Sequence, residues 1–160
     1  MKRSAKPYLT KEQALQKLQR YCAYQDRCHQ EVRFKLLDLG VYGDTLEEIM
    51  AELVEERFLD EERFARSFAR GKFRMKQWGR VRIRRELKQR DISDYCIRQA
   101  MTEIDDAAYD NTLRELLRNR WLHYAQENDD FKRRQKTAAV ALRRGFEPEL
   151  VWAGIRQLTD

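Results

Sequence analysis

The chain has 160 residues, of which 38% are charged and 42% hydrophobic, with only six Gly and two Pro. So few turn-forming residues argue against a β-sandwich or barrel, which needs a turn about every 8–12 residues. The net charge of +6 favours a polyanionic partner, and no apolar run approaches the roughly 18 residues that a membrane span requires.

The N-terminal segment, residues 1–9, is basic and lacks the apolar stretch of a secretory signal. We therefore expect a short disordered N-terminus. Cys22, Cys28 and Cys96 are an odd number without the spacing of a disulfide framework, which indicates reduced thiols. Together these features predict a cytoplasmic protein.

The first helix is predicted to begin after Thr10, because Thr10 and Gln13 have the spacing of a capping box. A second helix is expected over residues 27–39, and Gly40 is suited to a left-handed stop after it. A second capping box, Thr45 with Glu48, predicts the start of a third helix.

Apolar residues at helical spacing recur through the rest of the chain and predict six more helices. One is expected around residues 64–68, and the others over residues 81–89, 94–104, 113–124, 132–144 and 149–158.

The second and third helices of these triplets align as a repeat. The segment VRFKLLDLGV (32–41) matches IRRELKQRDI (83–92) and TAAVALRRGF (137–146), so Gly40, Asp91 and Gly145 share one stop position. The first copy has three extra residues in its following loop. A period of roughly 50 residues predicts stacked units that are each too small to be stable alone. We therefore predict an all-α fold of three tandem three-helix, helix-turn-helix-like repeats in an elongated curved stack, spanning residues 10–58, 59–105 and 106–160.

Charge is separated along the chain. Residues 43–62 carry nine acids and one Arg, whereas residues 71–91 carry nine Lys or Arg and two acids. A merely soluble surface intersperses the two signs, so this separation suggests a partner. The acidic segment has three open interpretations: a helix with favourable N-terminal charges, a contact for a basic protein, or a clamp on the neighbouring basic segment.

The basic segment is predicted to present a positive face. If the apolar residues of helix 81–89 face the core, Arg84, Arg85 and Lys88 point outward, with Arg80 and Arg82 beside them. The equivalent helix of the third repeat is also basic. The predicted nucleic-acid or filament contacts are Lys72, Arg74, Lys76, Arg80, Arg82, Arg84, Arg85, Lys88, Lys132, Arg133, Arg134, Lys136, Arg143 and Arg144.

Two simpler interpretations stay open. The basic face is also consistent with a solvated charged surface, because a charge run is a weak signal. Phe73, Trp78 and Tyr95 have the aromatic rings that stack on bases, but burial is the commoner role of such rings. Trp121 and Trp152 are also expected to be buried.

No catalytic or metal-binding pattern is present in the sequence. His29 and His123 are the only histidines, and the C-x5-C-H spacing of Cys22, Cys28 and His29 has no second ligand pair. Phosphate-binding glycine loops and nucleophile elbows are absent from the sequence. We therefore predict no enzyme activity, no catalytic residue, no metal and no cofactor.

Three segments resemble the RecX family. DRCHQEVRFKLLDLG (26–40) is similar to the first-repeat signature, and FLDEERFARSFARGKFRMKQWGRVRIRRELKQRDI (58–92) resembles the second. KRRQKTAAVALRRGF (132–146) is similar to the end of the third. The resemblance extends over about residues 13–158. Cys28, Glu61 and Asp91 depart from the pattern at structural positions, and Cys28 in place of Ser implies a weaker helix cap.

The resemblance implies three stacked helical repeats and regulation of the RecA recombinase in bacterial recombination, DNA repair and the SOS response. It implies binding in the groove of the RecA nucleoprotein filament and inhibition of filament growth, ATPase and strand exchange, with single- or double-stranded DNA as a further partner. The protein is expected to be a monomer that contacts no membrane. The alternative is a stand-alone helix-turn-helix-like transcription regulator, which usually dimerises and reads bases with one recognition helix.

Overall fold

The structure is a computed structural model that describes residues 9–160. Within that range the protein is all-helical, with nine helices and no strand, as predicted. The predicted disordered N-terminus lies outside the described residues, except for residue 9. The helices are α1 (Lys11–Tyr24), α2 (His29–Asp38), α3 (Gly43–Glu55), α4 (Glu61–Lys76), α5 (Arg80–Gln89), α6 (Asp94–Met101), α7 (Asp106–His123), α8 (Asp130–Arg143) and α9 (Pro148–Thr159).

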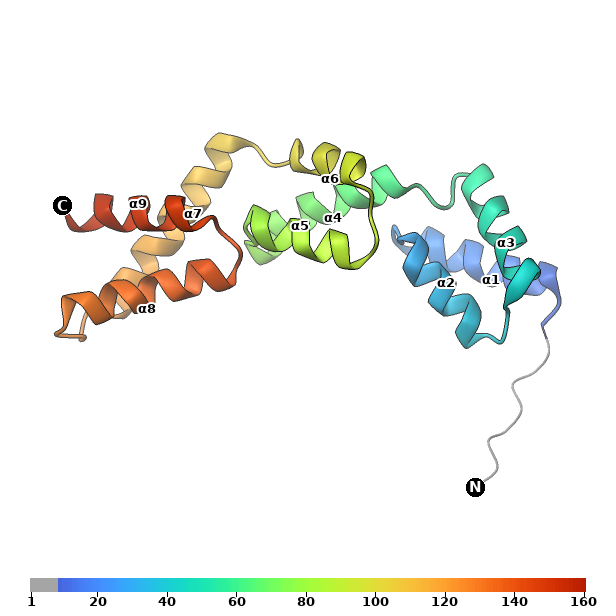
Figure 1. The fold of residues 1–160 in the computed structure, drawn as a ribbon, viewed down its shortest axis with the longest axis horizontal. Helices are drawn as coiled ribbons and strands as arrows, with labels where there is room; N and C mark the ends of the chain where they lie inside the picture. Colours follow the sequence, from blue (N-terminus) through green and yellow to red (C-terminus); the bar gives the residue numbers. More distant parts are fainter. Residues whose placement is uncertain (1–8) are drawn as a thin grey trace, which may run out of the picture.

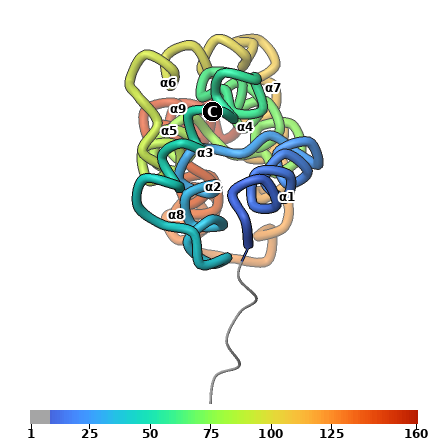
Figure 2. Tube along the Cα trace, turned by 90° about the vertical axis from the view of Figure 1, so that its right-hand side faces the viewer, coloured from blue at the N-terminus to red at the C-terminus, as the bar shows by residue number. Residues whose placement is uncertain are grey.

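The helices form three groups that follow one another along an elongated, curved row (Figure 1). We call α1–α3 the first group, α4–α6 the second and α7–α9 the third. Viewed along the row, the groups lie behind one another with a small cross-section (Figure 2). None of the helices described here is long and apolar enough to cross a bilayer.

The turn after the second helix is the same in all three groups. Gly40, Asp91 and Gly145 have φ angles of 83°, 59° and 93°, the left-handed conformation predicted for this position. The next amide in each group donates to the carbonyl five residues back, at 2.9, 3.2 and 3.2 Å, from Val41, Ile92 and Phe146. Asp91 makes this turn because Asp tolerates a positive φ better than most residues.

The aligned apolar positions are buried, which confirms the predicted inward faces. The nine positions from the second helices and their turns are Val32, Leu36, Val41, Ile83, Leu87, Ile92, Thr137, Ala141 and Phe146, and all are buried. On the third helices, Met101 is half-buried and its counterparts Leu53 and Ile155 are buried.

One of the two predicted capping boxes is present. The Thr10 side chain accepts from the Gln13 amide at 3.1 Å, and the Gln13 side chain accepts from the Thr10 amide at 2.9 Å. The second prediction is wrong, because α3 already begins at Gly43 and has no side-chain cap. Glu48 forms an ion pair with Lys11 at 3.2 Å instead. Cys28 starts α2 without a side-chain cap bond, as the resemblance implied.

The buried apolar residues form two clusters. One lies within the first group and extends from Ala14 to Leu59. The other is continuous through the second and third groups, and Cys28 is the one first-group residue that joins it among the described residues. The second and third groups therefore share one apolar core, and the first group has a largely separate one.

Candidate nucleic-acid interface

Helix α5 presents the predicted positive row. Its inward residues Ile83 and Leu87 are fully buried, and Arg84, Arg85 and Lys88 are exposed, as the helical periodicity predicted. Neither Arg84 nor Arg85 has an acidic group within ion-pair distance among residues 9–160. Lys88 lies 4.0 Å from the Asp94 carboxylate, the outer limit of an ion pair. We call these three cations the α5 row.

Arg80, predicted beside this row, turns toward the third group. Its side chain is only 19% exposed, and its guanidinium lies 2.7 Å from the Asp106 carboxylate and 3.0 Å from that of Glu147. The same guanidinium lies 3.8 Å from the centroid of the Tyr109 ring. The Arg80 charge is therefore neutralised by carboxylates of the third group.

Tyr109 completes this junction. The ring is fully buried and packs 5.0 Å from the Phe146 ring. Its hydroxyl donates to Glu147 and accepts from the Arg80 amide at 3.0 Å. Burial, together with the hydrogen bond to Glu147, raises the pKa of Tyr109 well above its ordinary value, so the hydroxyl keeps the proton that it donates.

Two glycines bring the loops of the second and third groups into direct backbone contact. The Gly79 amide donates to the Arg144 carbonyl at 2.7 Å, and the Val81 amide donates to the Gly145 carbonyl at 2.9 Å. A Cβ atom on Gly79 would lie 2.3 Å from the Gly145 carbonyl, which only glycine avoids. Arg82 packs its backbone against Gly145.

The side chains of Arg82 and Arg144 are likewise engaged near this contact. The Arg82 guanidinium lies 3.9 Å from the Trp78 ring centroid. Arg144 donates to the Gln77 side-chain oxygen at 2.7 Å. Both side chains are half-buried and engaged within the protein, although the sequence predicted them among the exposed contacts.

The basic cluster of the third group is mostly engaged in local interactions. Arg133 lies 3.7 Å from the Trp121 ring centroid and donates to the Trp121 carbonyl at 2.7 Å. Two of its neighbours form ion pairs: Arg134 with Asp130 at 2.9 Å, and Lys136 with Glu127 at 2.7 Å. Lys132 and Arg143 are exposed, and no acidic group of residues 9–160 pairs with them.

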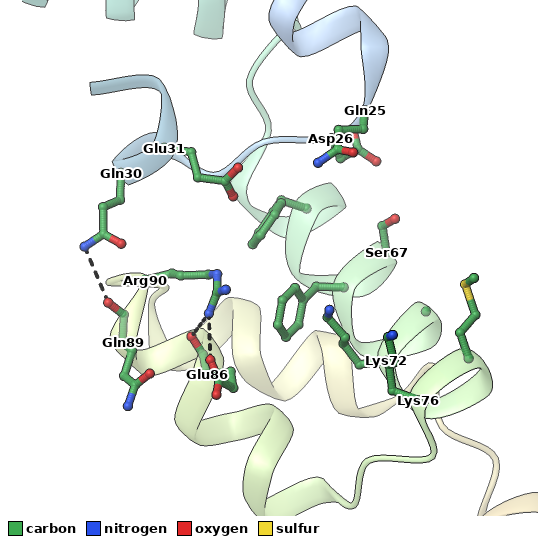
Figure 3. Close-up of a pocket in the computed structure, with 14 residues that line it drawn as sticks. Gln25, Asp26, Gln30, Glu31, Ser67, Lys72, Lys76, Glu86, Gln89 and Arg90 are labelled. Atoms are coloured by element: carbon green, nitrogen blue, oxygen red, sulfur yellow. Dashed lines mark hydrogen bonds and ion pairs between the residues drawn. The ribbon is translucent and has the colours of Figure 1, made fainter. Parts of the chain in front are cut away.

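The end of α4 carries the remaining predicted cations. Arg74 and Lys76 are exposed, whereas Lys72 is half-buried, with its amine 4.9 Å from the Trp78 ring centroid. Lys72 and Lys76 line a groove between the first and second groups (Figure 3), and no residue of the α5 row is among its lining residues. Sequence reasoning did not find this groove, because its walls come from different repeats.

Of the five aromatic residues discussed above, Phe73 is buried as expected, three are half-buried and Tyr95 is exposed. Phe73 is buried and packs on Tyr109 at 5.8 Å, while Trp78 is half-buried. Trp121 and Trp152 are half-buried too. Tyr95 is 56% exposed and is the one of the three stacking candidates whose ring is open to solvent.

The acidic segment forms its ion pairs outside the basic segment. Glu47 pairs with Arg33 at 2.5 Å, and Glu62 pairs with Arg66 at 3.3 Å. No ion pair within residues 9–160 joins residues 43–62 to residues 71–91. The acidic segment therefore does not clamp the basic one in this structure.

The three cysteines are buried free thiols. Burial raises the pKa of Cys22 and of Cys28 to about 11, so both thiols stay protonated at neutral pH. Across residues 9–160 no group of His, Cys, Asp and Glu side chains is placed to hold a metal ion.

Comparisons with known proteins agree with the resemblance. The family model for "RecX, second three-helix domain" matches residues 60–101, and the model for "RecX, third three-helix domain" matches residues 108–155. The "Regulatory protein RecX" of Prosthecochloris aestuarii is 32% identical over 141 residues, covering 88% of this chain and 87% of that protein. The protein of the same name from Clostridium perfringens is 24% identical over 135 residues, 84% of this chain but 63% of its own length.

Solved structures match in fold as well. The crystal structure of RecX from Lactobacillus salivarius superposes with a TM-score of 0.81 at 21% identity, covering 93% of this chain and 96% of that one. Another, "Crystal structure of regulatory protein RecX", gives a TM-score of 0.81 at 22% identity, covering 92% of this chain and 71% of that one. The Lactobacillus johnsonii relative is longer, and the matched region spans 34% of it. By two domain models and a relative aligned over most of both chains, this protein belongs to the RecX family of regulatory proteins and is not an enzyme.

Proposed function

We propose that this protein binds filaments of the RecA recombinase on DNA and inhibits filament growth, ATP hydrolysis and strand exchange. RecA is proposed as the partner because the chain belongs to the RecX family. The observation on this chain that supports it is the α5 row, where Arg84 and Arg85 are exposed and have no acidic partner among residues 9–160. Unneutralised cations on a rigid helix suit the phosphates of a nucleoprotein filament.

The proposed contact surface is narrower than the predicted one. Arg74, Lys132 and Arg143 are exposed like the α5 row, and we include them in the proposed surface. Arg80, Arg82, Arg133 and Arg144 are engaged within the protein. We therefore propose that these four arginines stabilise the fold beneath the contact surface and do not touch the filament.

The charge of the third helices disfavours the rival function, a stand-alone helix-turn-helix regulator. In such proteins the helix after the turn enters the major groove and reads bases. Here α3 carries five acids and no base, and α6 and α9 each carry one acid and one Arg. The cations instead lie on the second helix, α5, so the repeats lack an electropositive recognition helix.

The test is RecA ATPase on single-stranded DNA, measured with and without the purified protein. Inhibition at modest excess supports the proposal, and full ATPase at several-fold excess contradicts it. Arg84→Gln/Arg85→Gln is expected to weaken inhibition and to lower the log–log salt slope of binding by up to about 2. Arg114→Gln/Arg118→Gln removes the same charge from exposed positions on α7 and is the matched control.

A DNA-only mode of action would give a different pattern. If the protein bound duplex DNA as a dimer with sequence preference and left RecA ATPase unchanged, the regulator hypothesis would replace ours. Sedimentation of the protein with a short duplex measures both the dimer and the complex.

A further inference from the structure

A groove of about 800 Å³ lies between the first and second groups. Its lining comes from the α1–α2 connection, the start of α2, one side of α4 and the end of α5 (Figure 3). We call it the α4 groove, because residues Ser67 to Lys76 of α4 run along it. At 1.5 Å per helical residue this length is about 14 Å, which accommodates about four residues of an extended peptide.

The carboxylates that line the α4 groove are already neutralised. Each lies beside an arginine: Asp26 by Arg63 at 2.9 Å, Glu31 by Arg27 at 3.6 Å and Glu86 by Arg90 at 3.0 Å. The acidic wall therefore contributes little net charge to the space between the groups.

The lysines of the opposite side are different. No carboxylate of residues 9–160 lies within ion-pair distance of the Lys72 or Lys76 amine. Figure 3 shows both amines on the α4 side of the groove, four residues apart on one helix face. The net charge offered to a ligand in the groove is therefore positive.

Apolar surface lies beside these amines. Phe68 lines the groove and packs against the shared core, and Met75 is 83% exposed although it lies between two cations in the sequence. An exposed Met is an adaptable surface for another apolar side chain. Three amide side chains, those of Gln25, Gln30 and Gln89, supply donors and acceptors suited to a peptide backbone.

These features favour a peptide over a nucleic acid. A base needs an open ring face to stack on, but cations lie against the Phe68 ring: Arg90 at 4.9 Å and Lys72 at 5.5 Å from its centroid.

We propose that the α4 groove binds an acidic peptide segment of a partner protein, with its carboxylates on Lys72 and Lys76 and a large apolar side chain against Met75. The proposal does not rest on the filament function, which concerns the α5 row. Loss of one binding activity leaves the other measurable, so the two can fail separately.

The test is fluorescence anisotropy with a labelled synthetic peptide of Glu, Asp and a single Phe, titrated with the full-length protein. We expect binding that weakens with salt and that Lys72→Gln/Lys76→Gln weakens about five- to tenfold, the scale of two partly exposed ion pairs. Arg114→Gln/Arg118→Gln, an exposed pair with the same four-residue spacing on α7, is expected to leave the affinity unchanged. Thermal melting of each variant checks that the fold is intact.

A second variant tests the apolar half of the site. Met75→Ser is expected to weaken the Phe-containing peptide severalfold and to leave an analogue with Ala in place of Phe unchanged. Equal affinity of the wild type and the double lysine variant overturns the proposal, as does equal weakening by the α7 control. If oligothymidine displaces the peptide and its own binding is lost in the double lysine variant, the groove binds nucleic acid instead. If the wild type self-associates and the double lysine variant does not, the groove binds a second copy of the chain.

Discussion

The two junctions between neighbouring groups are built in different ways. Between the second and third groups the apolar core is continuous, Tyr109 is fully buried, and two backbone hydrogen bonds of 2.7 and 2.9 Å join the loops. Between the first and second groups the clusters are largely separate. Apart from Cys28, which joins the shared core, the contacts there include a 3.4 Å hydrogen bond from Gln30 to the Gln89 carbonyl, beside an open groove.

Repeats with the same sequence pattern and the same turn therefore need not form a uniform stack. Buried apolar area and buried hydrogen bonds make a junction resist opening, whereas solvent-exposed polar contacts are individually weak. We therefore expect the second and third groups to move as one body. The first group is expected to open and unfold at lower free energy.

Loss of a core side chain should show this difference most strongly. Leu53→Ala lies in the first cluster and Leu87→Ala in the shared one, and each is expected to cost about 2–5 kcal/mol because both side chains are fully buried. Hydrogen exchange is expected to show lost protection only in α1–α3 for Leu53→Ala, but throughout α4–α9 for Leu87→Ala. Uniform loss in both variants would mean that the three groups unfold together.

Substituting equivalent glycines should separate turn strain from the contact between groups. Gly40 and Gly145 hold the same turn, with φ of 83° and 93°. A Cβ on Gly40 meets nothing within 4 Å, whereas one on Gly145 lies 2.3 Å from the Arg82 Cβ. Gly40→Ala is expected to cost about 1 kcal/mol for the left-handed backbone, and Gly145→Ala about 2–4 kcal/mol because overpacking adds to it. Equal losses of unfolding free energy in urea would contradict the close approach.

Periodicity predicted much of the molecule, but only within each repeat. It placed Ile83 and Leu87 inward and Arg84 and Arg85 outward. This worked because the apolar periodicity of a helix shows which face packs on the other two helices of its group. It put Arg80 beside the exposed row, yet Arg80 reaches Glu147, 67 residues away. Which neighbour covers the flank of a helix depends on how repeats stack, and no local pattern records that.

The same reason explains the other differences. Arg133 and Arg82 look exposed by helical position but lie over Trp121 and Trp78. A Trp in the sequence signals burial without naming the cation beside it. The α4 groove was likewise invisible, since its lining includes residues 25–31 and 86–90, which are distant in the chain.

Removing the buried hydroxyl tests the junction between the second and third groups. Tyr109→Phe removes the hydroxyl that accepts from the Arg80 amide and donates to Glu147, and it is expected to cost about 1–3 kcal/mol. The pKa of Tyr109 is raised in the folded protein, so its contribution is fully present below the unfolded tyrosine value of about 10 and declines as pH rises above it. Urea unfolding above about pH 10 should show that the difference in unfolding free energy between wild type and Tyr109→Phe becomes smaller. A difference that grows with pH would mean that the pKa of Tyr109 is lowered in the folded protein.

The smallest expected effect concerns one ion pair at each junction. Arg80 and Glu147 are 19% and 24% exposed, while Arg63 and Asp26 at the first junction are 43% and 32% exposed. Two double-mutant cycles measure the coupling energy of each pair separately from the other contacts of its residues. One combines Arg80→Gln with Glu147→Gln, and the other combines Arg63→Gln with Asp26→Asn. Because water screens the more exposed pair, we expect a coupling of about 0.2–1 kcal/mol for Arg63–Asp26 that salt reduces. The Arg80–Glu147 coupling is expected to be larger and less sensitive to salt, since this pair is less exposed and both residues bond to the Tyr109 hydroxyl. Equal couplings with equal salt dependence would show that the two junctions differ in apolar burial alone.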